Sequence, residues 1–138
     1  MRILIADHQA HIRQGLQALL TAWPEVEVVG LAATSAELVQ RVGTGQAEVV
    51  LMDIPMAIGP ERLEVIHLVK SRWPQVKIVV LTMYTTHRAA ALAAGASAFL
   101  LKGCTAEALR EALVATGRTV AARVIPMTEC GRPLQLAS

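Results

Sequence analysis

Four polar side chains follow four apolar runs along this chain of 138 residues. Asp7 follows Ile3-Leu4-Ile5-Ala6, and Asp53 follows Val49-Val50-Leu51-Met52, while two later runs end on Thr82 and Lys102. Short apolar runs of this kind predict buried strands, and side chains at the carboxyl ends of adjacent parallel strands converge on one crevice. Two carboxylates, a hydroxyl and an ammonium in one place could bind a divalent metal ion and handle a phosphoryl group.

The elements that must position these side chains alternate along the sequence. Runs rich in Val, Ile and Leu predict strands over residues 2–6, 26–32, 48–52, 76–82 and 97–101. Segments with the period of a helix lie between these runs. Strands that alternate with helices, joined by right-handed crossovers, predict an α/β fold of the (βα)5 type, with a doubly wound parallel sheet of five strands.

Helix boundaries follow from capping and helix-breaking residues. The first helix is expected to bury one apolar face, made of Ile12, Leu16, Leu19 and Leu20. Thr34 and Glu37 have capping-box spacing at the start of the second helix, which should stop near Gly43 and Gly45. The other helices are predicted over about residues 60–73, 87–94 and 105–116, and the last of these is expected to end at Gly117.

The composition is that of a globular protein, with 54% hydrophobic and 17% charged residues. The net charge of +2 is too small to argue for direct nucleic-acid binding. No run approaches the roughly 18 apolar residues that a membrane helix needs, so we expect no membrane partner. We expect Cys104 and Cys130 to be reduced thiols, which fits a cytoplasmic location.

Five blocks of sequence resemble the receiver domain of two-component response regulators, in particular the NarL/LuxR-type branch. In order, the blocks are Ile3-Leu4-Ile5-Ala6-Asp7, Ile12-Arg13-Gln14-Gly15-Leu16, Val49-Val50-Leu51-Met52-Asp53, Val79-Val80-Leu81-Thr82-Met83-Tyr84 and Ala94-Gly95-Ala96-Ser97-Ala98-Phe99-Leu100-Leu101-Lys102. The resemblance implies a flavodoxin-like fold with strand order 2-1-3-4-5. It also implies a receiver domain over residues 1–117, followed by a tail or the start of a linker over residues 118–138.

By this resemblance Asp53 is the phosphoacceptor, and a phosphohistidine of a sensor histidine kinase is the donor. The expected cofactor is Mg²⁺, bound by Asp7, Asp53 and the backbone carbonyl of Pro55. Lys102 would contact the phosphoryl group as a point charge, and Thr82 would donate a hydrogen bond to it. The chain is therefore expected to be a signalling domain rather than an enzyme.

The resemblance also implies a two-state switch. The new bond at Thr82 would pull in the loop that follows it and let Phe99 move inward. The face made by the fourth helix, the fifth strand and the fifth helix would then change its interactions, with homodimer formation as one outcome. Transcription regulation would come from a DNA-binding domain outside this chain or from a partner.

His8 departs from the family pattern, which has a second acid at this position. Mg²⁺ prefers oxygen ligands, so an imidazole here is expected to weaken or abolish Mg²⁺ binding. The alternative is that Asp7, Asp53 and water molecules still suffice. A softer metal site made by His8 and His11 is also conceivable from their spacing, but both positions fall in a loop and the first turn of a helix.

Two other functions remain open at this stage. His8 and the short fourth helix are consistent with an atypical receiver that acts as a phosphorylation-independent protein-interaction module. A hydrolase that uses Asp53 as a transient nucleophile is disfavoured, because such enzymes usually carry a second acid two residues later, where this chain has Pro55.

Overall fold

The structure is a computed structural model that describes residues 1–53, 63–83, 88–118 and 125–128. Its strands are β1 (Arg2–Ala6), β2 (Glu27–Ala32), β3 (Val49–Met52), β4 (Lys77–Thr82), β5 (Ala98–Leu101) and β6 (Ile125–Thr128). Its helices are α1 (Ala10–Thr21), α2 (Ser35–Val42), α3 (Glu64–Arg72), α4 (Arg88–Ala94) and α5 (Ala106–Arg118). Strands and helices alternate through the first five pairs, as the sequence predicts.

All described strands belong to one parallel sheet with the order β2-β1-β3-β4-β5-β6. The order of the first five strands is the predicted one. β6 adds a sixth strand on the outer side of β5, in a region expected from the sequence to be a tail or the start of a linker. β6 contains Pro126, which has no N–H to donate, and its position at the sheet edge is one that tolerates proline.

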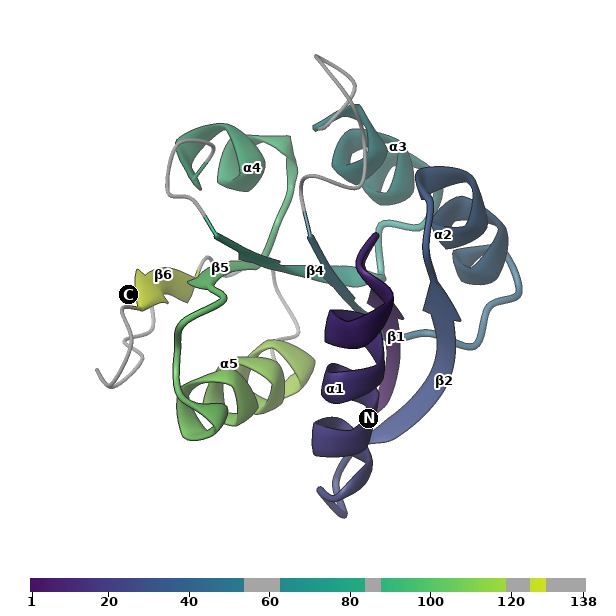
Figure 1. Cartoon of the computed structure of the whole chain (residues 1–138). Helices are drawn as coiled ribbons and strands as arrows, with labels where there is room; N and C mark the ends of the chain where they lie inside the picture. Colours follow the sequence, from purple (N-terminus) through teal and green to yellow (C-terminus); the bar gives the residue numbers. More distant parts are fainter. Residues whose placement is uncertain (54–62, 84–87, 119–124, 129–138) are drawn as a thin grey trace.

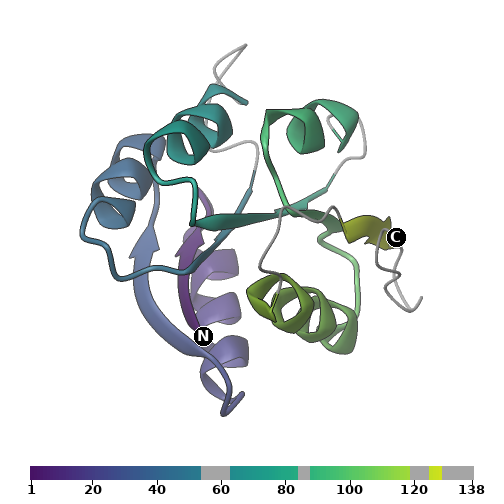
Figure 2. The same ribbon diagram turned by 180° about the vertical axis from the view of Figure 1, so that it is seen from behind.

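The helices form two layers around the sheet (Figure 1). α1 and α5 cover one face, while α2, α3 and α4 cover the other, and the view from behind shows the same division (Figure 2). A parallel sheet covered on both faces needs apolar side chains on both faces of its strands. This requirement explains the near-continuous Val, Ile and Leu runs in the sequence.

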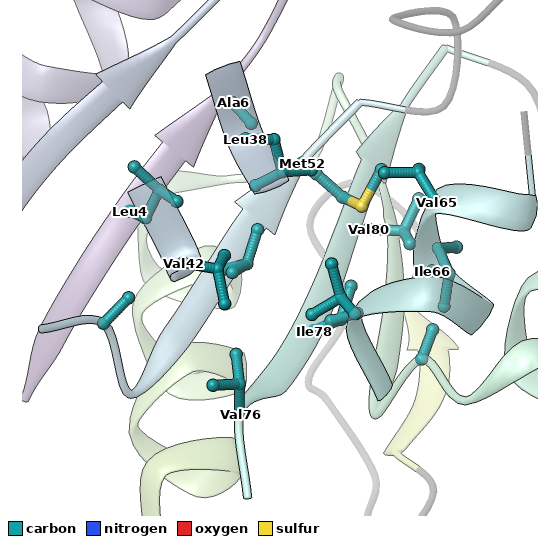
Figure 3. Packing of buried hydrophobic residues seen from close by; sticks show 14 of the residues in the cluster. Leu4, Ala6, Leu38, Val42, Met52, Val65, Ile66, Val76, Ile78 and Val80 are labelled. Atoms are coloured by element: carbon teal, nitrogen blue, oxygen red, sulfur yellow. The ribbon is translucent and has the colours of Figure 1, made fainter. Parts of the chain in front are cut away.

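Each face of the sheet has its own apolar core. Leu4 and Ala6 of β1 point into the cluster beneath α2, α3 and α4, which Figure 3 shows from close by. Ile3 and Ile5 point the other way, into the cluster beneath α1 and α5. Two tryptophans divide in the same manner, since Trp23 belongs to the second cluster and Trp73 packs against the first.

The helix ends agree with several of the capping predictions. Thr34 caps α2 by accepting a hydrogen bond from the Glu37 backbone N–H at 3.1 Å, and the Glu37 side chain accepts one from the Ala33 N–H at 3.3 Å. Gly43 is the C-cap of α2, and Gly45, two residues later, adopts a positive φ of 77°. The predicted starts of the third and fourth helices, near residues 60 and 87, lie outside the described residues.

Gly117 does not end the last helix, and that prediction was wrong. α5 continues through this residue to Arg118. A Cβ atom at position 117 would lie 2.7 Å from Met1 Sδ, which is closer than real Cβ contacts. The glycine therefore allows the chain start to pack close to α5, and it is not needed here to terminate a helix.

Candidate functional site

The parallel pairing of the strands brings the predicted polar residues to the carboxyl end of the sheet. Ala6 and Met52 are register partners in β1 and β3, so Asp7 and Asp53 leave adjacent strands side by side. The Asp53 N–H donates to the Ala6 carbonyl at 3.0 Å. On the other side, the Lys102 N–H donates to the Thr82 carbonyl at 2.7 Å. These backbone hydrogen bonds between neighbouring strands determine where each side chain leaves the sheet.

Lys102 lies between the two carboxylates. Its Nζ atom is 2.9 Å from Asp53 Oδ2 and 3.1 Å from Asp7 Oδ2. The two acidic side chains are 1% and 2% exposed, and that of Lys102 is 9% exposed. One buried ammonium therefore neutralises part of the negative charge of two buried acids.

His8 also reaches this cluster. Its Nδ1 atom is 3.3 Å from Asp53 Oδ2 and 3.7 Å from Asp7 Oδ1. Unlike the acids, the His8 side chain is 43% exposed. His8 thus lies on the solvent side of the site.

Burial and ion pairing act in opposite directions on the charges. Burial raises the pKa of Asp53 above its ordinary value and outweighs the hydrogen bond from Lys102, which lowers it. For Lys102, burial alone would lower the pKa, but hydrogen bonds to Asp53 and Asp7 raise it overall. Among the described residues, the second oxygen of Asp53, Oδ1, is buried and has no hydrogen-bond partner.

Two further residues support the site, and sequence reasoning gave them no role. The Gln9 N–H donates to Asp7 Oδ1 at 2.9 Å, and Gln9 Oε1 accepts from Lys102 Nζ at 3.4 Å. Arg13 Nη1 donates to the Asp7 carbonyl at 2.8 Å. The bond from Gln9 to Asp7 is an Asx-turn, which an Asp three residues before the first residue of a helix could have indicated.

Thr82 and Phe99 occupy the expected elements. Thr82 ends β4 and is 2% exposed, and its described contact with the site is the backbone bond from Lys102. Phe99 lies in the middle of β5 with its ring fully buried in the core cluster beneath α4. The ring is already inward in this structure, and its proposed movement stays a prediction.

The described residues contain one group able to hold a metal ion, made of Asp7, His8 and Asp53. One donor atom from each lies within 4.8 Å of the others. His11 is not part of this group. The Pro55 carbonyl lies outside the described residues.

The chain was then compared with known proteins. Residues 3–114 match the response regulator receiver domain. The DNA-binding transcriptional activator DevR/DosR of Mycobacterium tuberculosis is 35% identical over 121 residues, covering 85% of this chain and 55% of that protein. The oxygen regulatory protein NreC of Staphylococcus carnosus is 34% identical over 122 residues, covering 87% of this chain and 54% of that protein. This chain belongs to the response regulator receiver domain family.

Solved structures agree with this assignment. The isolated REC domain of RcsB from Salmonella enterica serovar Typhimurium, in the presence of the phosphomimetic BeF₃⁻, is 27% identical with a TM-score of 0.75. The similarity covers 83% of this chain and 86% of that domain. The fold is thus the flavodoxin-like receiver fold predicted from the sequence, and receivers of this kind are signalling domains rather than enzymes.

The receiver spans about half the length of the curated relatives it matches. Receiver domains of this family are phosphorylated by sensor histidine kinases, and RcsB dimers have been seen bound to DNA. In the described part of the receiver, no helix combines the length and the apolar character that crossing a membrane requires.

Receiver domains generally bind Mg²⁺ at an acidic cluster, and this receiver meets that requirement only in part. Asp7 and Asp53 supply the carboxylate oxygens, and Asp53 Oδ1 is a buried acceptor whose bonding capacity is unused among the described residues. The third donor is an imidazole nitrogen, whereas Mg²⁺ prefers oxygen. The donor set fits a divalent cation, but it is not the all-oxygen set that suits Mg²⁺ best.

Proposed function

We propose that this receiver accepts a phosphoryl group on Asp53 from a phosphohistidine of a sensor histidine kinase. The proposal rests on the buried Asp53 carboxylate. It lies 2.9 Å from Lys102 Nζ and beside Asp7, at the carboxyl end of the sheet. A carboxylate oxygen of Asp53 would form a bond to phosphorus as the bond from phosphorus to the histidine nitrogen breaks. The imidazole leaves with a proton in place of the phosphoryl group.

Lys102 supplies fixed positive charge for this transfer. Its ammonium already lies against Asp53 Oδ2, so it can follow negative charge onto the phosphoryl oxygens without a large movement. Because the pKa of Lys102 is raised, the side chain stays charged at neutral pH. Thr82, at the end of the next strand, would donate its hydroxyl hydrogen to a phosphoryl oxygen and report the modification to the loop after β4.

Asp7 and Asp53 would hold a divalent cation next to the acceptor. A bound cation supplies charge neutralisation for the incoming phosphoryl group. Its binding at this site is expected to be weaker for Mg²⁺ than in a receiver with a second acid, because His8 occupies that position. His8 is also the exposed group beside Asp53, so the donor must approach past its imidazole.

We propose transcription regulation as the output of this receiver. The curated relatives include a DNA-binding transcriptional activator, and the matched part of this chain covers only about half of their length. This partial coverage supports residues 1–117 as a receiver and residues 118–138 as a tail or the start of a linker. We expect a DNA-binding domain outside this chain or a partner to act on DNA, with the α4–β5–α5 face as the interaction or homodimer surface. A cytoplasmic location fits this role.

Incubation with acetyl phosphate and Mg²⁺, followed by intact-mass measurement, tests the proposal. Wild-type protein should gain the mass of one phosphoryl group, and Asp53→Asn should gain none. If wild type stays unmodified under conditions that label an ordinary receiver, the phosphoacceptor function is wrong. In that case a phosphorylation-independent interaction module, which the comparisons do not favour, becomes the better account.

A further inference from the structure

Two distances from His8 to the acids are close to those between ligands of a small tetrahedral metal site, and the donor atoms of all three residues lie within 4.8 Å of one another. His8 Nδ1 lies 3.3 Å from one Asp53 oxygen and 3.7 Å from one Asp7 oxygen. Nitrogen and oxygen ligands about 2.0–2.1 Å from a tetrahedral ion are roughly 3.4 Å apart. Adjacent ligands in the octahedral shell of Mg²⁺ are closer, at roughly 3.0 Å.

The types of the donors agree with their spacing. Two carboxylates and one imidazole form a ligand set that suits zinc and neighbouring first-row metals, whereas Mg²⁺ is bound by oxygen alone. Affinity for nitrogen and oxygen sites rises along the first row towards copper and stays high at zinc. The substitution that weakens a magnesium site is therefore the one that creates a site for these ions.

The surroundings of the three residues also point to a ligand. Asp53 is 1% exposed, yet its Oδ1 is buried without a hydrogen-bond partner among the described residues. Asp7 is already oriented by the Gln9 N–H and, through its carbonyl, by Arg13. The His8 imidazole is 43% exposed, so an ion bound beside it could take a water molecule as its fourth ligand.

We propose that Asp7, His8 and Asp53 form a three-ligand site for a late first-row divalent ion, Zn²⁺ or Co²⁺, which this receiver binds in preference to Mg²⁺. The proposal rests on the same site as the proposed phosphoacceptor function and specifies its metal. The bound ion would replace Lys102 as the closest positive charge to the Asp53 carboxylate. Lys102 would then remain available to a phosphoryl group.

Calorimetric titration of the full chain with Zn²⁺, Co²⁺ and Mg²⁺ separately tests the preference. We expect Zn²⁺ and Co²⁺ to bind on the order of 100-fold more tightly than Mg²⁺. Bound Co²⁺ should also show the intense visible absorption bands of tetrahedral coordination, which octahedral Co²⁺ lacks. Equal or tighter binding of Mg²⁺ would overturn the proposal, and so would the absence of Zn²⁺ binding.

Histidine variants test whether His8 is one of the metal ligands. His8→Ala should lower Zn²⁺ affinity roughly 10-fold or more and leave Mg²⁺ affinity nearly unchanged. Loss of a residue that only supports a metal ligand already costs roughly 10-fold, so loss of a ligand should cost at least as much. His11→Ala is the matched control, since His11 is exposed, lies three residues away and is outside the metal-binding group. His8→Gln provides a second variant of similar shape. If His8→Ala keeps Zn²⁺ affinity, or His11→Ala loses it, the ion is bound elsewhere and His8 only pairs with the acids.

These titrations contain no phosphoryl donor, so the two proposals can fail separately. A receiver that is phosphorylated with Mg²⁺ but does not bind Zn²⁺ would retain the proposed function and lose this metal site. A receiver that binds Zn²⁺ through His8 but is never phosphorylated would keep the site and lose the function.

Discussion

At the scale of single residues, the site depends on one ammonium that lies between two buried carboxylates. Lys102→Met would leave Asp7 and Asp53 close together without their shared counter-ion. Removing one partner of a buried ion pair costs roughly 3 kcal/mol or more, so we expect a loss of this size in the free energy of unfolding at neutral pH. Urea denaturation of both proteins measures it.

The loss should depend on pH in a defined direction. Asp53 has a raised pKa, so acid protonates it early, and the cost of Lys102→Met should shrink as the pH falls through that pKa. The pKa of Lys102 is also raised, so its stabilising effect is complete at neutral pH and is lost only as alkaline pH deprotonates it. The double variant Lys102→Met with Asp53→Asn is the control and should recover part of the stability. A cost that does not change with pH would contradict this account.

His8→Asp should restore an all-carboxylate site. A third oxygen ligand in place of the imidazole favours Mg²⁺, and we expect its affinity to rise roughly 10-fold or more. Equilibrium titration with Mg²⁺ measures the change. His11→Asp introduces the same charge at an exposed position outside the group and should have little effect. A similar gain in both variants would mean that His8 does not determine metal affinity.

The sequence was sufficient to predict which charged residues meet, but not how they pair. Asp7, Asp53 and Lys102 each follow a strand, and parallel strands have their carboxyl ends on the same side of the sheet. Their convergence can therefore be predicted without knowledge of side-chain conformations. The roles of Gln9 and Arg13 depend on rotamers and on the path of the loop before α1, which no residue pattern determines.

At the scale of elements, α2 depends on its cap. Thr34→Ala removes the side-chain oxygen that accepts from the Glu37 N–H. Loss of such a cap costs about 1 kcal/mol, and thermal or urea denaturation should show a decrease of that size. Thr34→Ser keeps the oxygen and should retain most of the stability. An equal loss in both variants would mean that the methyl group, rather than the cap, matters.

Two glycines should respond in opposite directions to substitution by alanine. Gly95 has a φ of 123°, and an added Cβ would lie 2.7 Å from Lys70 Cγ. Lys70 is held by hydrogen bonds to the carbonyls of Pro74 and Val76, so it cannot simply move away. We expect Gly95→Ala to cost about 1–3 kcal/mol of unfolding free energy.

Gly15 is the matched control for this substitution. It lies exposed in α1, and nothing would be within 4 Å of an added Cβ. Gly15→Ala should therefore stabilise the protein by about 0.5–1 kcal/mol, because alanine loses less conformational freedom in a helix. Destabilisation by Gly15→Ala, or tolerance of Gly95→Ala, would contradict the backbone assignments.

Element boundaries were predictable where a local interaction sets them. The start of α2 was correct because Thr34 and Glu37 interact within a single turn. Gly117 was misassigned because its role is set by Met1, which is remote in sequence but adjacent in space. Strand β6 was not predicted, since four residues containing a proline give no clear strand pattern.

At the scale of the whole molecule, the receiver should fold without its last twenty residues. The described members of the two core clusters come from residues up to Ala115, and β6 joins the sheet at an edge. A chain ending at Arg118 should keep its circular dichroism spectrum and lose no more than about 2 kcal/mol of stability. It should also still be labelled by acetyl phosphate. An unfolded product would place the domain boundary beyond residue 118.

The division of the core between the two faces of the sheet has an optical consequence. The chain has two tryptophans, and one indole packs against each layer: Trp23 beneath α1 and α5, and Trp73 against the cluster of α2, α3 and α4. The Arg110 guanidinium lies 5.5 Å from the centre of the Trp23 ring, so that fluorophore has a charged neighbour of its own. Variants that retain a single tryptophan would thus give each layer a separate emission signal, with which the melting of the two halves of the core can be timed against each other.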